Sequence, residues 1–141
     1  MSAPTYALLY QSRATRGLDT SDLRAILETA VVRNEALDVT GLLVYGEMAK
    51  LPGVPGLFVQ WLEGPEAAVR ALYERIAMDS RHTDVQTLGE GPSEVFTGSD
   101  GRLFPAWAMA VKRLSDVPAT LHGFLEYARA SVSPRLTSRS A

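Results

Sequence analysis

The sequence predicts an α+β domain of the ferredoxin-like class, a βαββαββ sandwich with an additional C-terminal helix. Helical and β-prone segments alternate in the order β-α-β-β-α-β-β, which places two helices on one face of an antiparallel or mixed sheet. The chain has 141 residues, enough for one domain with a core of its own. Residues 57–64 (LFVQWLEG) are apolar on both faces, so the strand they predict is expected to be covered on both sides.

Residues 5–12 (TYALLYQS) predict the first strand, because the run is β-prone and its side chains alternate. One face of this strand consists of Tyr6, Leu8, Tyr10 and Ser12. A helix follows a short loop, and Thr20 or Ser21 is expected to cap its start. Its apolar stripe has helical spacing and consists of Leu23, Ile26, Leu27, Ala30 and Val31. Asn34 continues that stripe, so a polar amide is expected to face the core.

The middle of the chain predicts two buried strands and a second helix. Residues 38–46 (DVTGLLVYG) form a continuous apolar run, and Gly41 inside it indicates a close approach by another part of the chain. A loop rich in glycine and proline separates this strand from residues 57–64. Pro65 suits the first position of a helix. The buried stripe of that helix is expected to consist of Ala68, Val69, Leu72, Tyr73 and Ile76.

The last third of the chain predicts two further strands and a final helix. Residues 84–88 are the next strand, 89–102 a loop in which Val95 and Phe96 could be extended, and 104–114 (FPAWAMAVKRL) the last strand. An amphipathic helix at 117–131 is expected to cover the free face of the sheet or to build a dimer. We therefore expect a domain at 1–112, a helical extension at 113–131 and a frayed tail at 132–141.

Composition excludes several classes of function. The net charge of −2 gives no basic footprint for nucleic acid or an acidic membrane. The chain has no cysteine, and His82 and His122 lack ligand spacing, so we expect neither disulfides nor a metal site. No apolar run approaches a membrane span and the N-terminus lacks the pattern of a signal peptide. These features predict a soluble, cytoplasmic protein.

Gln60 raises the question of what its amide bonds to. In an extended strand Gln60 shares a face with Phe58 and Leu62, and a buried amide without hydrogen bonds costs about 1–3 kcal/mol. In the predicted fold Tyr10, Asn34 and Gln60 meet between the helices and the sheet, where a phenol and two amides suit a flat heterocycle. Apolar walls for such a ligand are expected from Ile26, Leu43, Phe58, Leu62 and Ile76. Each polar residue also has a structural alternative: a packed tyrosine, a helix-capping asparagine, or a glutamine bonded to a strand edge.

Five segments in order, from about Tyr6 to Val111, resemble the BLUF domains, bacterial blue-light sensors that use FAD. They are YQS (10–12), RNEALDVTGLLVY (33–45), FVQWLEG (58–64), RIAMDSRH (75–82) and FPAWAM (104–109). The chain departs from the pattern in a longer loop at 46–56, an insertion within 94–103, alanine for a common serine at Ala30, and Arg33 where some members have histidine.

The resemblance implies roles for matching positions. Tyr10 is expected to give an electron and a proton to the photoexcited flavin, and Gln60 to bond Tyr10 and the N5 and O4 edge and to rotate or tautomerise after light. Asn34 is expected to hold the C4 carbonyl and N3. The remaining implied cofactor contacts are Ile26, Ala30, Arg33, Leu43, Phe58, Leu62, Ile76, Asp79, Arg81 and His82. Trp107 and Met109 match a pair implied to relay the signal, and which of them faces the flavin stays open.

The resemblance also implies a stand-alone photoreceptor that is not an enzyme. It would bind FAD, with FMN or riboflavin possible, and act through a protein partner or a homo-oligomer, without nucleic acid or membrane. One alternative is an enzyme of the acylphosphatase kind, but that needs a glycine-rich phosphate cradle, and residues 10–17 (YQSRATRG) match one poorly. Another is a ferredoxin-like ligand-binding or dimerisation module that has lost photochemistry.

Overall fold

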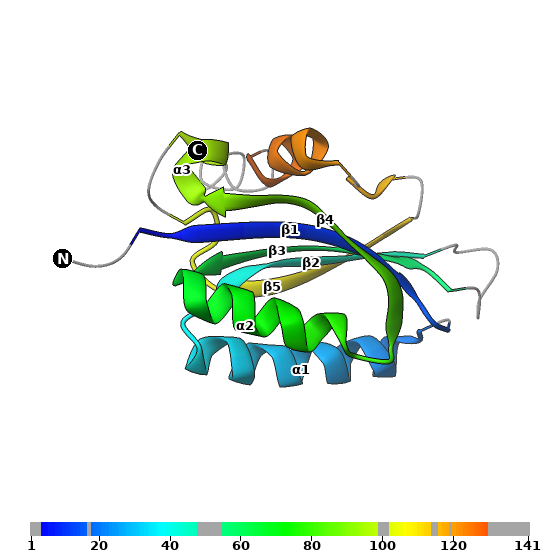
Figure 1. Cartoon of the computed structure of the whole chain (residues 1–141). Coiled ribbons are helices and arrows are strands. Elements are labelled where there is room, and N and C mark those ends of the chain that lie inside the picture. Colours follow the sequence, from blue (N-terminus) through cyan, green and yellow to red (C-terminus); the bar gives the residue numbers. More distant parts are fainter. Residues whose placement is uncertain are drawn as a thin grey trace, which may run out of the picture.

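The computed structural model describes residues 4–16, 18–47, 55–98, 102–113, 116–118 and 120–129. The elements are β1 (Tyr6–Ala14), α1 (Thr20–Ala36), β2 (Thr40–Glu47), β3 (Leu57–Gly64), α2 (Glu66–Ala77), β4 (His82–Pro92), α3 (Ser93–Thr97) and β5 (Trp107–Arg113). Residues 121–129 form a further helix. Figure 1 shows α1 and α2 on one face of the sheet and this C-terminal helix on the other.

The sheet has five strands in the order β4-β1-β3-β2-β5. β1 pairs antiparallel with β3 and β4, β2 pairs antiparallel with β3, and β5 lies parallel to β2. This mixed sheet confirms the predicted α+β class. The register aligns Tyr10 with Gln60, Gln60 with Leu43, and Leu43 with Met109, so residues distant in sequence form one row across the sheet.

β3 is covered on both sides, as its apolar pattern predicts. Val59 and Trp61 belong to the core beneath the C-terminal helix, where the ring of Phe124 stacks on Trp61 with centroids 5.8 Å apart. Phe58 and Leu62 belong to the cores beneath α1 and α2. The expectation that the C-terminal helix covers the free face is therefore confirmed for residues 121–129, and a dimer built by this helix stays a prediction.

The start of α1 differs from the prediction. Asp19 caps the helix, not Thr20 or Ser21: its side chain accepts from the backbone N–H of Asp22 at 2.8 Å, and the Asp22 side chain accepts from the backbone N–H of Asp19 at 3.0 Å. This reciprocal pair satisfies two backbone donors at once, and a cap at Thr20 or Ser21 would lack it, because Leu23 or Arg24 would then take the place of the Asp22 carboxylate.

Val31 is 37% exposed, so its assignment to the buried stripe of α1 was wrong. The helix rests on the sheet along a row that includes Leu23, Ala30 and Asn34, all buried, and position 31 is turned past that row toward solvent.

The region after α2 contains more regular structure than expected. β4 is longer than residues 84–88, because it follows β1 from the pair of His82 with Ala14 to the pair of Pro92 with Tyr6. Val95 and Phe96 are helical in α3, so the expectation of extended backbone there was wrong. α3 ends at Gly98, whose φ of 73° is the left-handed conformation that favours glycine.

Two further predicted elements, the last strand and the final helix, have different bounds in the structure. The last strand begins at Trp107, and Phe104 is buried in the core before it. The final helix is described from residue 121 to 129, whereas 130–131, the tail at 132–141 and most of the long loop at 46–56 lie outside the described residues.

Within the described part of the chain, no helix is long and apolar enough to cross a membrane.

Gly41 confirms the close approach that its place in an apolar strand indicates. A Cβ atom there would lie 1.8 Å from the backbone oxygen of Trp61, a distance that no side chain can tolerate. Glycine at this position therefore lets β2 pass against β3 beside the residues that form the site.

Candidate functional site

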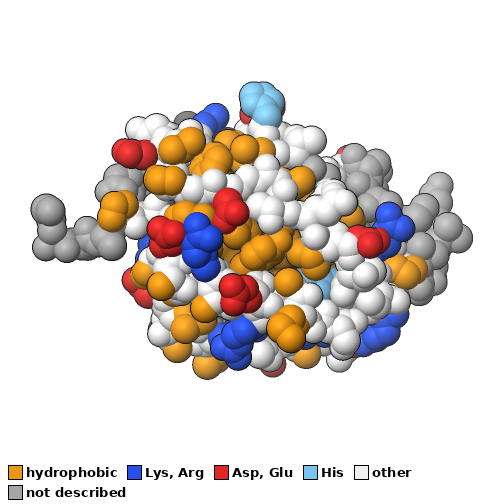
Figure 2. Space-filling view, viewed as in Figure 1, with side chains coloured by type: hydrophobic (Ala, Val, Ile, Leu, Met, Phe, Trp, Pro, Cys, Tyr) orange, Lys and Arg blue, Asp and Glu red, His pale blue; other side chains and the backbone are white. Residues whose placement is uncertain are grey.

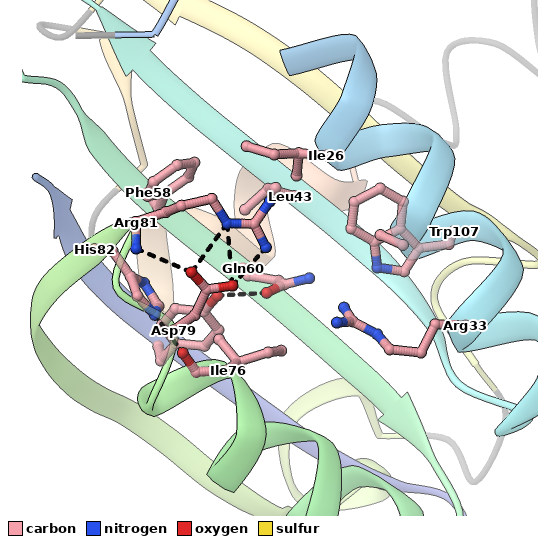
Figure 3. A pocket seen from close by; sticks show the side chains of 12 residues that line it. Ile26, Arg33, Leu43, Phe58, Gln60, Ile76, Asp79, Arg81, His82 and Trp107 are labelled. Carbon is pink, nitrogen blue, oxygen red and sulfur yellow. Dashed lines mark hydrogen bonds and ion pairs between the residues drawn. The ribbon is translucent and has the colours of Figure 1, made fainter. Parts of the chain in front are cut away.

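A pocket that is open to solvent on one side lies between α1, the end of α2 and the sheet (Figure 3). Its lining consists of Tyr10, Ile26, Ala30, Arg33, Leu43, Phe58, Gln60, Ile76, Asp79, Arg81, His82 and Trp107. Most of the positions implied by the sequence resemblance are thus brought together in one place.

Tyr10 and Gln60 form the central contact of this pocket. Because they are cross-strand partners on β1 and β3, their side chains meet on the same face. The Tyr10 hydroxyl donates to Gln60 Oε1 at 2.5 Å, and the two residues are 2% and 3% exposed. In Figure 3 the amide nitrogen of Gln60 points away from the phenol, toward the side where Arg33 and Trp107 lie. The phenol therefore satisfies the glutamine oxygen and leaves its N–H groups directed at the pocket.

Tyr10 is held as a neutral donor. Burial raises its pKa above the ordinary value of 10.0, and the neighbouring Tyr73 raises it further. The Tyr73 ring lies 5.5 Å from the Tyr10 ring, and His82 approaches edge-on at 6.1 Å. Since its folded-state pKa is raised, Tyr10 contributes stability below pH 10 that is lost only as the pH rises further. The phenol accordingly donates to Gln60 throughout the neutral range.

Asn34 and Trp107 supply buried donors without acceptors. Asn34 is fully buried, and its Oδ1 accepts from Arg33 Nε at 3.3 Å. Asn34 Nδ2 and Trp107 Nε1 have no hydrogen-bond partner among the described residues. The Asn34 side chain does not cap α1, which ends at Leu37. Leaving such donors unpaired costs about 1–3 kcal/mol each, so a ligand rich in acceptors fits this donor set.

Charged groups lie at the mouth of the pocket. Arg81 Nε donates to both carboxylate oxygens of Asp79, at 2.9 and 3.0 Å, and this pairing lowers the pKa of Asp79 to about 2. Burial lowers the pKa of Arg33, and the nearby Arg75 and Arg81 lower it further. Arg33 makes no ion pair with a carboxylate in the described part of the chain, so the mouth carries excess positive charge toward an anionic ligand.

His82 is fixed in the wall by two hydrogen bonds. Its Nδ1 lies 2.7 Å from Ser12 Oγ and its Nε2 lies 2.5 Å from the carbonyl oxygen of Ile76, so Nε2 donates and Nδ1 accepts from the serine. Ser12 is a contact of the pocket residue His82 that the sequence reasoning did not assign. The signal was present, because Ser12 shares a strand face with Tyr10.

Three expected site residues lie away from the pocket lining. Leu62 is fully buried in the core beneath α2 and does not line the pocket, because its row of the sheet lies under that helix. Asn34 is behind the lining, and Met109 packs partly buried against the core beside Ile26. Trp107 lines the pocket, whereas Met109 is not among the lining residues. In the described residues no group of histidine and carboxylate side chains is placed to hold a metal ion.

Comparison with known proteins shows which protein family this chain matches. A family model described as "BLUF: Sensors of blue-light using FAD" matches residues 5–110. Photoactivated adenylate cyclase subunit beta is 48% identical over 85 residues in both Euglena longa and Euglena gracilis, covering 60% of this chain. Subunit alpha of Euglena gracilis is 42% identical over 85 residues. The chain spans only 9% of the beta subunits and 8% of the alpha subunit.

Solved structures agree with this match. The dark state of BlrB, a BLUF protein, superposes with a TM-score of 0.63 at 27% identity, covering 92% of this chain and 87% of that one. A bacterial light-regulated adenylyl cyclase gives 0.61 at 26% identity, covering 96% and 36%. Klebsiella pneumoniae BlrP1 with FMN and cyclic diGMP gives 0.62 at 28% identity, covering 88% and 29%. Relatives thus come from Euglena and from bacteria, and a bacterial source for this chain stays a prediction.

Proposed function

The chain belongs to the BLUF family of blue-light sensors, which bind flavin, and from this premise we propose that it binds FAD non-covalently in the pocket beside Gln60. The observation that carries the proposal is the buried Tyr10–Gln60 hydrogen bond, set among donors that lack acceptors. FMN and riboflavin are the alternatives to FAD, since they carry the same ring. The excess positive charge near Arg33 favours a phosphorylated flavin.

The residues of the pocket fit an isoalloxazine ring. Asn34 Nδ2 and Trp107 Nε1 are buried donors that the acceptor edge of such a ring would satisfy. Arg81 and His82 at the mouth suit the ribityl and phosphate groups, with Asp79 orienting Arg81. Apolar contacts to the ring would come from Ile26, Ala30, Leu43, Phe58 and Ile76. When bound, the flavin supplies the absorption of blue light and an excited state that accepts an electron.

The Tyr10–Gln60 pair can respond to light because its hydrogen bond has two arrangements. In the one observed, Tyr10 donates to Gln60 Oε1 and the amide nitrogen faces the pocket. If Tyr10 gives up an electron and its phenolic proton and then regains them, Gln60 is free to turn or tautomerise before the bond reforms. A turned amide would direct its N–H donor at the Tyr10 oxygen and its carbonyl oxygen at the pocket, so the hydrogen bonding offered to a bound ring would change. Burial excludes water from this exchange, so both arrangements persist as distinct states.

We propose that the signal leaves the chain through a downstream protein or a second copy. We assign the sensor to 1–112 and a helical extension to 113–131, and this chain spans only 9% of the relatives named as photoactivated adenylate cyclase subunit beta. The BLUF domain itself is a sensor, and we propose that this chain has no enzymatic activity of its own. We also propose a cytoplasmic location, from the composition alone. Figure 2 shows acidic and basic side chains interspersed on the face it displays, with no basic patch there among the described residues.

Replacing Asn34 by leucine, which has a similar shape, tests the donor set. We expect the affinity for FAD to fall about 10- to 100-fold, corresponding to roughly 1–3 kcal/mol for a lost buried hydrogen bond. The flavin-free protein should lose little stability, since Asn34 Nδ2 has no partner there and Oδ1 makes only a long hydrogen bond, 3.3 Å from Arg33 Nε. Titration of refolded, flavin-free protein followed by flavin fluorescence measures this affinity. Glu35→Leu, at the exposed neighbouring position of α1, is the control, and an unchanged affinity in Asn34→Leu would refute the assignment.

The absorption spectrum of the purified protein tests the proposed function. It is recorded in darkness, immediately after blue light and during recovery. A flavin spectrum that moves to the red and returns supports the photoreceptor. A flavin spectrum that light leaves unchanged contradicts the roles given to Tyr10 and Gln60, and a colourless protein favours the binding or dimerisation module.

A further inference from the structure

Glu63 is a fully buried carboxylate that the site described above does not use. It lies on β3, on the face opposite the pocket, beside Trp61. Oε1 accepts from Trp61 Nε1 at 3.1 Å and from the backbone N–H of Leu103 at 2.9 Å, while Oε2 accepts from the N–H of Phe104 at 2.6 Å. Burial raises the pKa of Glu63, and these hydrogen bonds together with Arg102 oppose the rise. We call Glu63, Trp61 and the two backbone N–H groups the Glu63 cluster.

The Glu63 cluster holds the segment that leads into β5. Arg102, the residue before Leu103, donates to the carbonyl oxygen of Asp38 at 2.9 Å and to Thr40 Oγ1 at 3.1 Å. Thr40 is the cross-strand partner of Glu63. Residues 102–104 are therefore fastened at one end of the sheet to both β2 and β3.

The register places this attachment next to the pocket tryptophan. Along β2 the residue after Thr40 is Gly41, and Gly41 pairs with Trp107 at the start of β5. Only two residues lie between Phe104, whose backbone N–H donates to Glu63, and Trp107, which lines the pocket. A displacement of Trp107 along or away from β2 therefore strains the hydrogen bonds that Glu63 makes to the segment before it.

The same carboxylate also reaches the C-terminal helix. The Trp61 ring that donates to Glu63 stacks on Phe124, with centroids 5.8 Å apart and planes 14° apart, and meets the edge of Phe96 at 5.9 Å. Phe124 is fully buried, so this stack is part of the interface between the helix and the sheet. The Trp61 ring is thus held in its orientation by the hydrogen bond to Glu63, and a change in that orientation would alter its stacking contact with Phe124.

We propose that Glu63 is a positioning residue that couples Trp107 in the pocket to the Trp61–Phe124 stack on the opposite face of the sheet. The inference rests on the proposed function only in taking the Trp107 side as the light-sensing side. A merely structural carboxylate would stabilise the fold but leave the two tryptophans independent of one another. The coupling itself is a property of the protein with or without flavin, so it can be measured without light.

The two tryptophans of the chain, Trp61 and Trp107, are convenient probes of the coupling. Protein labelled with 5-fluorotryptophan gives one fluorine resonance for each, assigned with Trp61→Phe and Trp107→Phe. Glu63→Gln keeps the shape but turns one acceptor oxygen into a donor, which opposes at least one of the three N–H groups. We expect both resonances to shift or split in Glu63→Gln, in flavin-free and in flavin-bound dark protein. Glu94→Gln on α3, an exposed glutamate, is the matched control and should move neither.

A Trp107 resonance that stays in place while that of Trp61 moves would overturn the proposal, because Glu63 would then act locally. If Glu63→Gln fails to fold, Phe124→Leu provides the second test, since it alters the stack and leaves Glu63 intact. Coupling requires the Trp107 resonance to move in Phe124→Leu as well, and an unmoved resonance would overturn the proposal. A missing red shift in the absorption spectrum would refute the photoreceptor and leave these measurements interpretable.

Discussion

A Gln60→Leu variant is expected to bind flavin and to show no red shift after blue light. Leucine fills nearly the same space but offers neither the oxygen that accepts from Tyr10 at 2.5 Å nor the N–H groups that face the pocket. The two arrangements of the amide disappear together, so nothing remains to change the hydrogen bonding at the ring. Difference spectra before and after illumination measure the loss, and the absorbance of bound flavin shows that the pocket still loads.

Gln86→Leu is the matched control for this variant. Gln86 lies on β4, is exposed, and bonds to Gln11 at 3.0 Å on the surface. Its replacement removes a glutamine from the same sheet without touching the pocket, and the red shift should keep its full amplitude. A normal shift in Gln60→Leu would exclude the amide as the element that responds to light.

A Tyr10→Phe variant is expected to retain flavin and to lose the light-induced shift. The ring can still pack against Tyr73 and His82, whose rings lie 5.5 and 6.1 Å away, so the pocket keeps its shape. The variant lacks both the phenolic proton and the donor to Gln60 Oε1. Leaving that buried oxygen without its donor costs about 1–3 kcal/mol, which thermal unfolding of the flavin-free protein can measure.

Tyr73→Phe is the matched control for Tyr10→Phe. It removes the hydroxyl of a neighbouring tyrosine and leaves the Tyr10 hydroxyl in place. The Tyr73 hydroxyl bonds to Thr87 Oγ1 at 2.8 Å near the surface, so its removal should leave the red shift in place. Recovery kinetics of both variants are followed at the red edge of the flavin band. An undiminished shift in Tyr10→Phe would mean that another group supplies the electron, and the role given to Tyr10 would be abandoned.

The acylphosphatase alternative receives no support from the loop after β1. Arg16, one of the two arginines in the residues that would have to cradle a phosphate, forms an ion pair with Asp22 at 3.0 Å, and this contact joins the loop to the start of α1. The pocket instead lies over the middle of the sheet, with Gln60 and Trp107 in its lining and the unpartnered Asn34 Nδ2 buried behind that lining. A flat ring fits that arrangement better than a tetrahedral anion.

The sequence determined which faces are buried and which polar residues lie on them. Strand and helix periods of 2 and 3.6 residues are local properties, so the alternation around Gln60 and the row ending at Asn34 could be read directly. The structure confirms that Gln60 shares a face with Phe58 and that Asn34 is fully buried. Polar residues on otherwise apolar faces predicted a ligand, because burial without partners is costly.

Only the tertiary structure decided which residues of a given face reach the pocket and which lie elsewhere along the same strand or helix. Leu62 lies on the same face of β3 as Gln60, but strand pairing places it beneath α2. On β5, Trp107 lines the pocket and Met109 does not. The buried role of Glu63 depends on backbone donors 40 and 41 residues away, which no local pattern reveals. Periodicity fixes the face of a residue, whereas strand pairing and helix packing, which are long-range contacts, fix its neighbours.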